Sequence, residues 1–386
     1  MYPKKVNYIE KEFIVMSKYQ ICTRCIMDTS DPKIYFDDNG VCNHCHRFDA
    51  NEELYGYREG SSDEKLKRLV AQMKKDGQGK EYDCILGISG GVDSAYMAYL
   101  TKKLNLRVLA VHVDAGWNSD VAVKNIKKMC EKLKIDLHTV VIDWPTMKEL
   151  QRAYMFSGLA NLDVPQDHVF LAAMYNYASK CHVKYMLNGS NVATEGVSPV
   201  AWGYTATDYA NIKSVYKKYG RGKSLKKYPH FGVLKYLKYQ SEIVRVDLLN
   251  YVPYSKKEAM ETLEREFGWE YYGGKHYESR FTKFFQGYFL PQRFGYDKKR
   301  SHLSSLVLGG EMTREEALEA MKDDSDYTEA QMMEDKEYIL KKLDISDSEW
   351  EGIMKGVKKT EDMYHSRKKM LAFLRMVKRK IKVLKG

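Results

Sequence analysis

The stretch that decides the fold runs Cys84-Ile85-Leu86-Gly87-Ile88-Ser89-Gly90-Gly91-Val92-Asp93-Ser94, and a helix-like stretch continues from it to Leu104. An apolar strand that turns into a helix N-terminus through glycines forms an anion-binding site. Free backbone N–H groups point at the ligand there, and the helix dipole favours negative charge. The two glycines permit close approach of oxygen atoms, and the two serines add hydroxyl donors. The Gly-Lys-Ser/Thr of a Walker loop is absent, which excludes a Walker NTPase.

This hexapeptide, residues 89–94, resembles the PP-loop of the ATP pyrophosphatases. Those enzymes cleave ATP between its α- and β-phosphates and leave AMP on a substrate oxygen. The alternative is an ordinary Gly-Gly turn before a helix, but the strand–turn–helix setting favours the nucleotide site. The residues expected to bind the nucleotide are Ser89, Gly90, Gly91, Val92, Asp93 and Ser94.

Strand-like and helix-like segments alternate from residue 82 onward. This pattern predicts a doubly wound parallel α/β sheet of the PP-loop ATP pyrophosphatase type, with helices on both faces and ligands at the carboxyl ends of the strands. Asp114 and Gly189 each follow a predicted strand, so we expect both beside the PP-loop, with Asp114 near the ribose or adenine edge. The expected strands are residues 83–88, 107–113, 137–142 and 184–187, and the expected helices are 94–104, 120–133 and 167–181.

A cysteine-rich module precedes the sheet. Two CxxC pairs, Cys22/Cys25 and Cys42/Cys45, are separated by sixteen residues. Four thiolates at this spacing are typical of a closed, tetrahedral, structural zinc site, and an iron–sulfur cluster is the alternative. We expect the neighbouring His44 to be an exposed polar residue and not a ligand.

The composition bounds the class of protein. The chain has 386 residues, is 44% hydrophobic and contains seven cysteines. No apolar run has the length of a membrane span and no signal peptide is visible, so a cytoplasmic location is expected. The division expected from the sequence is an N-terminal extension (1–16), the zinc module (17–60), a PP-loop ATP pyrophosphatase domain (61–205), and a mainly helical substrate and partner region (206–386) with a basic tail (365–386).

The basic tail carries most of the net charge. Nine of its residues are Lys or Arg and none is acidic, so subtracting them from the formal charge of +11 leaves about +2 for the body. A nearly neutral body argues against nucleic acid as the partner. Met370 and Leu374 begin an apolar stripe at helical spacing, which predicts that this face packs on the protein's own body. Docking to a partner subunit or to an anionic membrane are the alternatives.

Three blocks together resemble the N-acetyl sugar amidotransferases, which make acetamidino sugars for lipopolysaccharide, O-antigen and pseudaminic or legionaminic acid glycans. The first block is the cysteine module, Cys22 to Cys45, and the second is the PP-loop. The third runs from Tyr272-Gly273-Gly274-Lys275-His276-Tyr277-Glu278-Ser279-Arg280 to His302-Leu303-Ser304. The resemblance implies an ATP-dependent, AMP-forming C–N ligase that uses Mg²⁺ held by Asp93.

Replacing an acetamido oxygen by nitrogen requires activation, because amide oxygen is a poor leaving group. Transfer of AMP to that oxygen gives an O-adenylated imidate, from which ammonia displaces AMP. The PP-loop lacks a lysine, so positive charge for the phosphates must come from elsewhere. Lys275, His276 and Arg280 are the candidate catalytic residues. Further candidates for substrate contact are Asp167, His168, Glu195, Lys283, Arg293, Lys298, Arg300 and His302.

The source of ammonia is expected to be a separate protein. Cys84, Cys130 and Cys181 lack the sequence context of a glutaminase nucleophile. The resemblance implies a glutaminase subunit and an ammonia-channelling synthase subunit as partners, and an N-acetylated sugar, nucleotide-linked or nonulosonic, as substrate. The nearest enzymatic alternative is a PP-loop tRNA-thiolating enzyme, which would need a free reactive thiol or an iron–sulfur cluster near the nucleotide. A zinc-containing adaptor that binds nucleic acid through the tail is the non-catalytic alternative.

Overall fold

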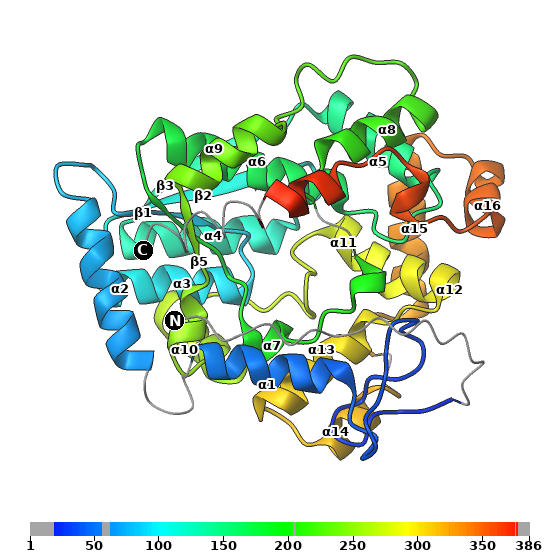
Figure 1. Cartoon of the computed structure of the whole chain (residues 1–386). Coiled ribbons are helices and arrows are strands. Elements are labelled where there is room, and N and C mark those ends of the chain that lie inside the picture. The colour runs from blue at the N-terminus through cyan, green and yellow to red at the C-terminus, as the bar shows by residue number, and fades with distance from the viewer. Residues whose placement is uncertain (1–18, 56–61, 204–205, 324, 375, 377–386) are drawn as a thin grey trace.

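The computed structural model describes residues 19–55, 62–203, 206–323, 325–374 and 376 (Figure 1). Its centre is a five-stranded sheet with the order β3-β2-β1-β4-β5, in which every neighbouring pair is parallel. This confirms the predicted parallel α/β fold. The strands are β1 (Cys84–Gly87), β2 (Val108–Asp114), β3 (Asp136–Val141), β4 (Tyr185–Leu187) and β5 (Val244–Val246).

The sheet buries both of its faces, because alternate residues of each central strand enter different apolar clusters. Cys84 and Leu86 of β1 belong to one cluster, and Ile85 between them belongs to the other. The first cluster includes α2 (Ser62–Asp76), α3 (Val92–Lys103), α4 (Asp120–Leu133) and α10 (Lys256–Phe267). The second includes α5 (Trp144–Met155), α6 (Val164–Lys180), α8 (Tyr209–Tyr219) and α9 (Val233–Glu242).

The C-terminal region is mainly helical, as expected, and it packs into the same apolar cluster as α5 and α6. Phe281, Phe284, Ile339 and Trp350 contribute to that cluster. Thr313 and Glu316 form a capping box at the start of α14. The elements are α11 (Arg280–Phe284), the π-helical turn η3 (Phe285–Phe289), α12 (Leu290–Phe294), α13 (Lys298–Gly309), α14 (Arg314–Ala320), α15 (Glu329–Leu343) and α16 (Asp347–Lys355).

The cysteine-rich module lies against this C-terminal region although it comes from the other end of the sequence. In Figure 1 the blue N-terminal segment lies beside α13 and α14. Its four cysteines share a third apolar cluster with Val192, Trp202 and Leu308. The remaining short elements are α1 (Asn43–Tyr55), α7 (Val192–Glu195), η1 (Val200–Trp202), η2 (Leu248–Tyr251) and η4 (Glu361–Met363).

The start of the basic tail packs on the body, but with a different face from the one predicted. Residues 368–374 are helical, and Leu371 is only 3% exposed, whereas Met370 is 41% exposed. Leu371 shares a cluster with Tyr364, so the helix is turned by one residue from the predicted stripe. The rest of the stripe, from residue 377, and the extension 1–16 lie outside the described residues. Within the described ranges, no helix combines the length and apolar character needed to cross a membrane.

Candidate active site

The PP-loop follows β1 and its two serines hold its shape. Ser94 Oγ donates to the Gly91 carbonyl at 3.0 Å and accepts from the Ser89 amide at 3.2 Å. Ser89 Oγ in turn accepts from the Gly91 amide at 3.3 Å. Gly91 is the N-cap of α3 and provides no side chain to cap it. The N-terminus of α3 therefore suits an anion, as expected for a phosphate site, although its first amide, that of Val92, donates to the Tyr272 hydroxyl.

Two glycines of the loop are required by their surroundings. Gly90 has φ +86°, and a Cβ there would lie 2.5 Å from the Ala122 carbonyl oxygen of α4. A Cβ on Gly91 would lie 3.0 Å from the Tyr272 hydroxyl and 3.3 Å from Glu278 Oε1. Close approach of other groups thus explains both glycines.

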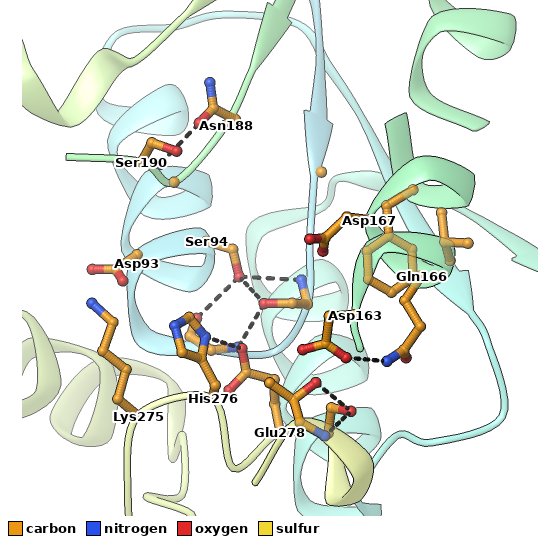
Figure 2. Close-up of a pocket in the computed structure, with 18 of the residues that line it drawn as sticks. Asp93, Ser94, Asp163, Gln166, Asp167, Asn188, Ser190, Lys275, His276 and Glu278 are labelled. Atoms are coloured by element: carbon orange, nitrogen blue, oxygen red, sulfur yellow. Dashed lines mark hydrogen bonds and ion pairs between the residues drawn. The ribbon is translucent and has the colours of Figure 1, made fainter. Parts of the chain in front are cut away.

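A segment of the C-terminal region covers the loop. Trp269 Nε1 donates to the Gly90 carbonyl at 3.1 Å, and the Tyr272 hydroxyl accepts from the Val92 amide at 3.3 Å. Glu278 faces the same loop and lies near His276, with 3.7 Å between Glu278 Oε1 and His276 Nδ1 (Figure 2). The anion site is therefore built jointly by the sheet and by residues almost 200 positions later in the chain.

The loop opens into a cleft of about 680 Å³. Figure 2 shows Ser94 facing Asp163, Gln166 and Asp167 of the segment that begins α6, with Lys275 beside Asp93 and His276 between Asp93 and Asp163. This is the switch point of the sheet, where the chain order reverses between β1 and β4. Expected site residues that line the cleft are Ser89, Gly91, Val92, Asp93, Ser94, Asp167, Gly189, Glu195, Lys275, His276 and Lys298.

Charged groups cluster on the nucleotide side of this cleft. Lys275 Nζ lies 3.0 Å from Glu195 Oε1 and donates to the Thr194 carbonyl at 3.3 Å. Burial alone would lower the pKa of Lys275, but the carboxylates of Glu195 and Asp93 raise it above the ordinary value. Asp93 accepts hydrogen bonds from the Tyr254 hydroxyl and from Asn191 Nδ2, the latter at 3.4 Å. A lysine thus reaches the PP-loop from the C-terminal region.

Lys256 and Asp163 are cleft residues that sequence reasoning missed. Lys256 is the first residue of α10, and its burial, together with the nearby Lys275, lowers its pKa. Asp163 is buried and accepts from Gln166 Nε2 at 2.7 Å, and burial with like-charge repulsion from Asp167 raises its pKa to about 7. Each looks in sequence like an ordinary helix-start residue, so no local signal distinguishes them.

Two candidates from the sheet side lie elsewhere than expected. Asp114 accepts from the Gly116 amide at 2.8 Å and from Asn118 Nδ2 at 3.1 Å, so it shapes the turn after β2 and does not line the cleft. His168 is fully buried and packs between aromatic rings, including Phe231 at 4.6 Å between centroids. Its burial lowers its pKa to about 4. A substrate role for His168 is therefore wrong in this geometry.

Four basic candidates of the C-terminal region also stay outside the cleft. Arg280 pairs with Glu334 at 2.8 Å and with Asp335, and Lys283 reaches Asp335 at 3.3 Å. These pairs fasten α11 to α15, so Arg280 does not serve as a catalytic residue here. Arg293 is buried between the rings of Phe289 and Phe294. Arg300 contacts the cysteine module through the Ile26 carbonyl at 2.8 Å.

His302 stands just behind the cleft wall. Its ring centroid lies 5.6 Å from that of His276. Burial and the neighbouring Lys275, His276 and Lys298 hold the pKa of His302 well below its ordinary value. It is therefore a neutral neighbour of the site.

The four cysteines form a second site, far from the PP-loop in sequence. Their Sγ atoms lie within 4.8 Å of one another, with contacts of 3.6 Å and 3.7 Å. A single ion with metal–sulfur bonds of about 2.3 Å requires sulfur–sulfur edges of about 3.8 Å. The thiolates therefore fit one tetrahedral metal ion. His44 is not a ligand, but the expectation of exposure was wrong, since it is buried and pairs with Asp31 at 2.8 Å.

Comparisons with known proteins agree with this geometry. The family model for NAD synthase matches residues 64–230, and the model described as LPS biosynthesis protein WbpG-like, C-terminal domain, matches residues 278–379. A probable sulfurtransferase of Methanocaldococcus jannaschii is 26% identical over 47% of this chain and 59% of its own length. A tRNA(Ile)-lysidine synthase of Chlamydia pneumoniae is 28% identical over 28% of this chain and 37% of its own length.

Solved structures give weak overall superpositions. An NH3-dependent NAD synthetase from Campylobacter jejuni covers 53% of this chain and 96% of its own, with 15% identity and a TM-score of 0.29. The U34-tRNA thiolase NcsA from Methanococcus maripaludis with its [4Fe-4S] cluster matches 83% of this chain and 88% of its own chain. The identity is 17% and the TM-score is 0.34.

The fold and the two family matches make residues 64–230 similar to the PP-loop ATP pyrophosphatases, and residues 278–379 similar to the WbpG-like C-terminal domain. Such proteins are ATP-using enzymes of the ligase or synthetase kind. The curated relatives match this chain over no more than 59% of their own length.

Proposed function

We propose that this protein is an ATP-dependent amidotransferase that converts an acetamido group of an N-acetylated sugar into an acetamidino group. The observation that carries the proposal is the shared cleft, in which the PP-loop faces Thr282, Gln286 and Lys298 of the WbpG-like region. Nucleotide and acceptor can therefore meet in one cavity. The name of the matched family model, an LPS biosynthesis protein, supports a sugar as the acceptor.

The acceptor side of the cleft has the chemistry of a carbohydrate site. Asn161, Gln166 and Gln286 offer planar amides, Asp163 and Asp167 offer carboxylates, and Trp202 lines the same side. Amides and carboxylates bind hydroxyl and acetamido groups by directional hydrogen bonds, and an indole ring provides an apolar wall.

The reaction has two steps. The acetamido oxygen attacks the α-phosphorus of ATP, the bond to the β-phosphate oxygen breaks, and pyrophosphate leaves toward the PP-loop amides. Ammonia then attacks the imidate carbon, and AMP leaves with the oxygen. Lys275 and Lys256, whose charges both act on Asp93 of the PP-loop, stabilise phosphate charge beside the loop. Asp93 is the residue that would hold Mg²⁺, which neutralises phosphate charge when bound. The four cysteines would hold Zn²⁺ in a structural role.

Ammonia is delivered by a partner glutaminase and synthase in this proposal. None of the chain's seven cysteines lines the cleft, and burial raises the pKa of the Cys130 thiol to about 11. The chain therefore offers no activated thiol for glutamine hydrolysis beside the nucleotide.

The relatives named as tRNA-modifying enzymes supply the second candidate, modification of a tRNA base. The missing cleft thiol argues against sulfur transfer by this chain alone. The experiment that separates the candidates incubates the purified protein with ATP, Mg²⁺ and ammonium, together with either N-acetylated sugars or tRNA. Release of AMP and pyrophosphate with a sugar, and a product mass that fits replacement of oxygen by NH, is expected. Turnover with tRNA and none with any acetamido sugar would reject the proposal.

A further inference from the structure

One arginine of the C-terminal region, Arg314, makes three hydrogen bonds to the cysteine module. Arg314, the first residue of α14, donates to the Cys22 carbonyl through Nε at 3.2 Å and through Nη2 at 2.9 Å. Its Nε also donates to the Cys25 carbonyl at 3.1 Å. Both acceptors belong to the first metal-binding knuckle, so the position of α14 depends on the shape of that knuckle.

The preceding helix, α13, contacts the same knuckle at two points. The Ile26 amide donates to Ser304 Oγ at 3.3 Å, and Arg300 Nη1 donates to the Ile26 carbonyl at 2.8 Å. Arg300 also lies 3.3 Å from Asp28 Oδ2. Residues 25–28 therefore bind along one side of α13.

The other end and side of α13 belong to the acceptor half of the cleft. The helix begins with Lys298, a cleft residue whose ammonium lies 6.0 Å from the centre of the Trp202 ring. Gly309 packs so closely on α7 that a Cβ would lie 2.6 Å from the Ala193 carbonyl oxygen. Glu195, which ends α7, also lines the cleft, at the border with the nucleotide side, where it pairs with Lys275. One continuous packed unit thus runs from the cysteines to three cleft residues.

We propose that the cysteine module sets the geometry of the acceptor half of the cleft, and that Arg314 is the positioning residue that transmits the metal-bound shape of the knuckle. Without the metal ion, the knuckle carbonyls lose their fixed directions, and Arg314 and Ser304 lose their partners. The PP-loop packs instead with β1 and α3, in an apolar cluster that contains none of the four cysteines. Metal loss should therefore loosen the acceptor side and spare the nucleotide side.

Hydrogen exchange tests this coupling without any assumption about the reaction. Arg314→Gln should raise amide exchange in residues 298–309 and 192–202 by about tenfold, and leave residues 84–103 unchanged. Arg24→Gln is the matched control, because it also removes one arginine charge beside the first knuckle, but the Arg24 side chain pairs with Asp49 of the module itself. Unchanged exchange in 298–309 would overturn the proposal.

A second variant guards against general unfolding. If Arg314→Gln also increases amide exchange in residues 84–103, the same exchange measurement on Ser304→Ala distinguishes local coupling from general unfolding. A rise confined to 298–309 and 192–202 supports the coupling, and unchanged exchange there rejects it. Removal of the metal by a chelator should reproduce the Arg314→Gln pattern, and added Zn²⁺ should reverse it.

A kinetic measurement tests whether the coupling between the cysteine module and the cleft affects binding of the acceptor sugar. Only this measurement rests on the proposed function. Arg314→Gln should raise KM for the acetamido sugar by about tenfold, and leave KM for ATP unchanged. If exchange changes as expected but the wild-type protein turns over no acetamido sugar, the coupling stands and the proposed function fails. If both KM values rise equally, the separation of the two halves is wrong.

Discussion

Lys275 lies 3.0 Å from Glu195, and this ion pair ties a loop of the C-terminal region to α7 beside the PP-loop. The PP-loop has no lysine of its own, and Lys275 supplies one from almost 200 residues later in the chain. Its ion pair with Glu195 keeps the Lys275 side chain oriented. A buried, paired lysine keeps its charge, as the raised pKa of Lys275 indicates.

Replacing this lysine tests its role. Lys275→Met should lower kcat for AMP formation by about 10²–10³-fold, because a cation near the departing pyrophosphate is lost. Rapid-quench assays of AMP formation, carried out below the unfolding temperature, measure this loss of kcat. Lys283→Met is the control, since Lys283 pairs with Asp335 away from the cleft. It should lower thermal stability and leave kcat unchanged. Equal losses of kcat in both variants would contradict the assignment.

The PP-loop itself is tested by its second glycine. Gly91→Val should abolish pyrophosphate release, because the new side chain would meet the Tyr272 hydroxyl and Glu278 at the anion site. Gly352→Val, in open space on α16, should keep full activity. Circular dichroism should show both variants folded. Release of ADP and phosphate by the wild-type protein would disprove α,β-cleavage.

Asp163 should make stability depend on pH. Its pKa is raised from 3.8 to about 7, so the folded state holds a proton that the unfolded state has already lost. The folded state binds more protons across that interval, and the free energy of unfolding therefore falls as pH rises from about 4 to about 7.

Asp163→Asn should weaken this dependence without removing it, because burial also raises the pKa of Asp167, to about 6. The variant should gain about 1–3 kcal/mol relative to wild type at pH 8 and little at pH 4, measured by urea unfolding. Asp38→Asn, in an exposed turn, is the control for a simple change of charge. A pH profile of Asp163→Asn that parallels that of the wild type would show that Asp163 does not titrate as described.

The metal site predicts about one zinc per chain by elemental analysis. Cys42→Ser should lose the ion and lower the melting temperature, since removing one thiolate opens the tetrahedron. Cys181→Ser, whose thiol lies outside the cluster, should retain it. Iron with sulfide in the purified protein, or full zinc retention in Cys42→Ser, would replace the zinc assignment.

The nitrogen source gives the last test. Ammonium should support amidine formation by the isolated chain, and glutamine should not, because no cysteine lines the cleft. Mass spectrometry of the sugar product measures both. Addition of a matching glutaminase and synthase should restore glutamine use. Efficient glutamine-dependent turnover by the chain alone would refute the need for partners.

The sequence predicted those parts of the fold and site that are local. β1, β2 and β4 appear as apolar runs because they are buried on both faces, and the PP-loop is a contiguous hexapeptide. β5 escaped prediction because it is only three residues long and two of them are exposed. It follows residue 205, where the boundary of the PP-loop domain was expected, so the sheet extends beyond that boundary.

The basic residues of the C-terminal region could not be sorted by sequence, because the backbone turns between them. Gly273 has φ +94° and His276 has φ +64°. These left-handed positions direct Lys275 into the cleft, whereas Arg280, only five residues later, faces α15. The charges of these residues and their spacing in the sequence indicate neither of the two turns.

The pairing of β5 with β4 has a consequence for biosynthesis. On the ribosome, β4 emerges with Tyr185 to Leu187 about 57 residues before its neighbour Val244 to Val246. The free edge of β4 and the apolar face of the sheet beside it therefore stay exposed to solvent and to chaperones until late in translation. Trp350 and Leu371, which belong to the shared apolar cluster, come later still. The nascent chain should acquire protease resistance in one late step, after most of the polypeptide has been made.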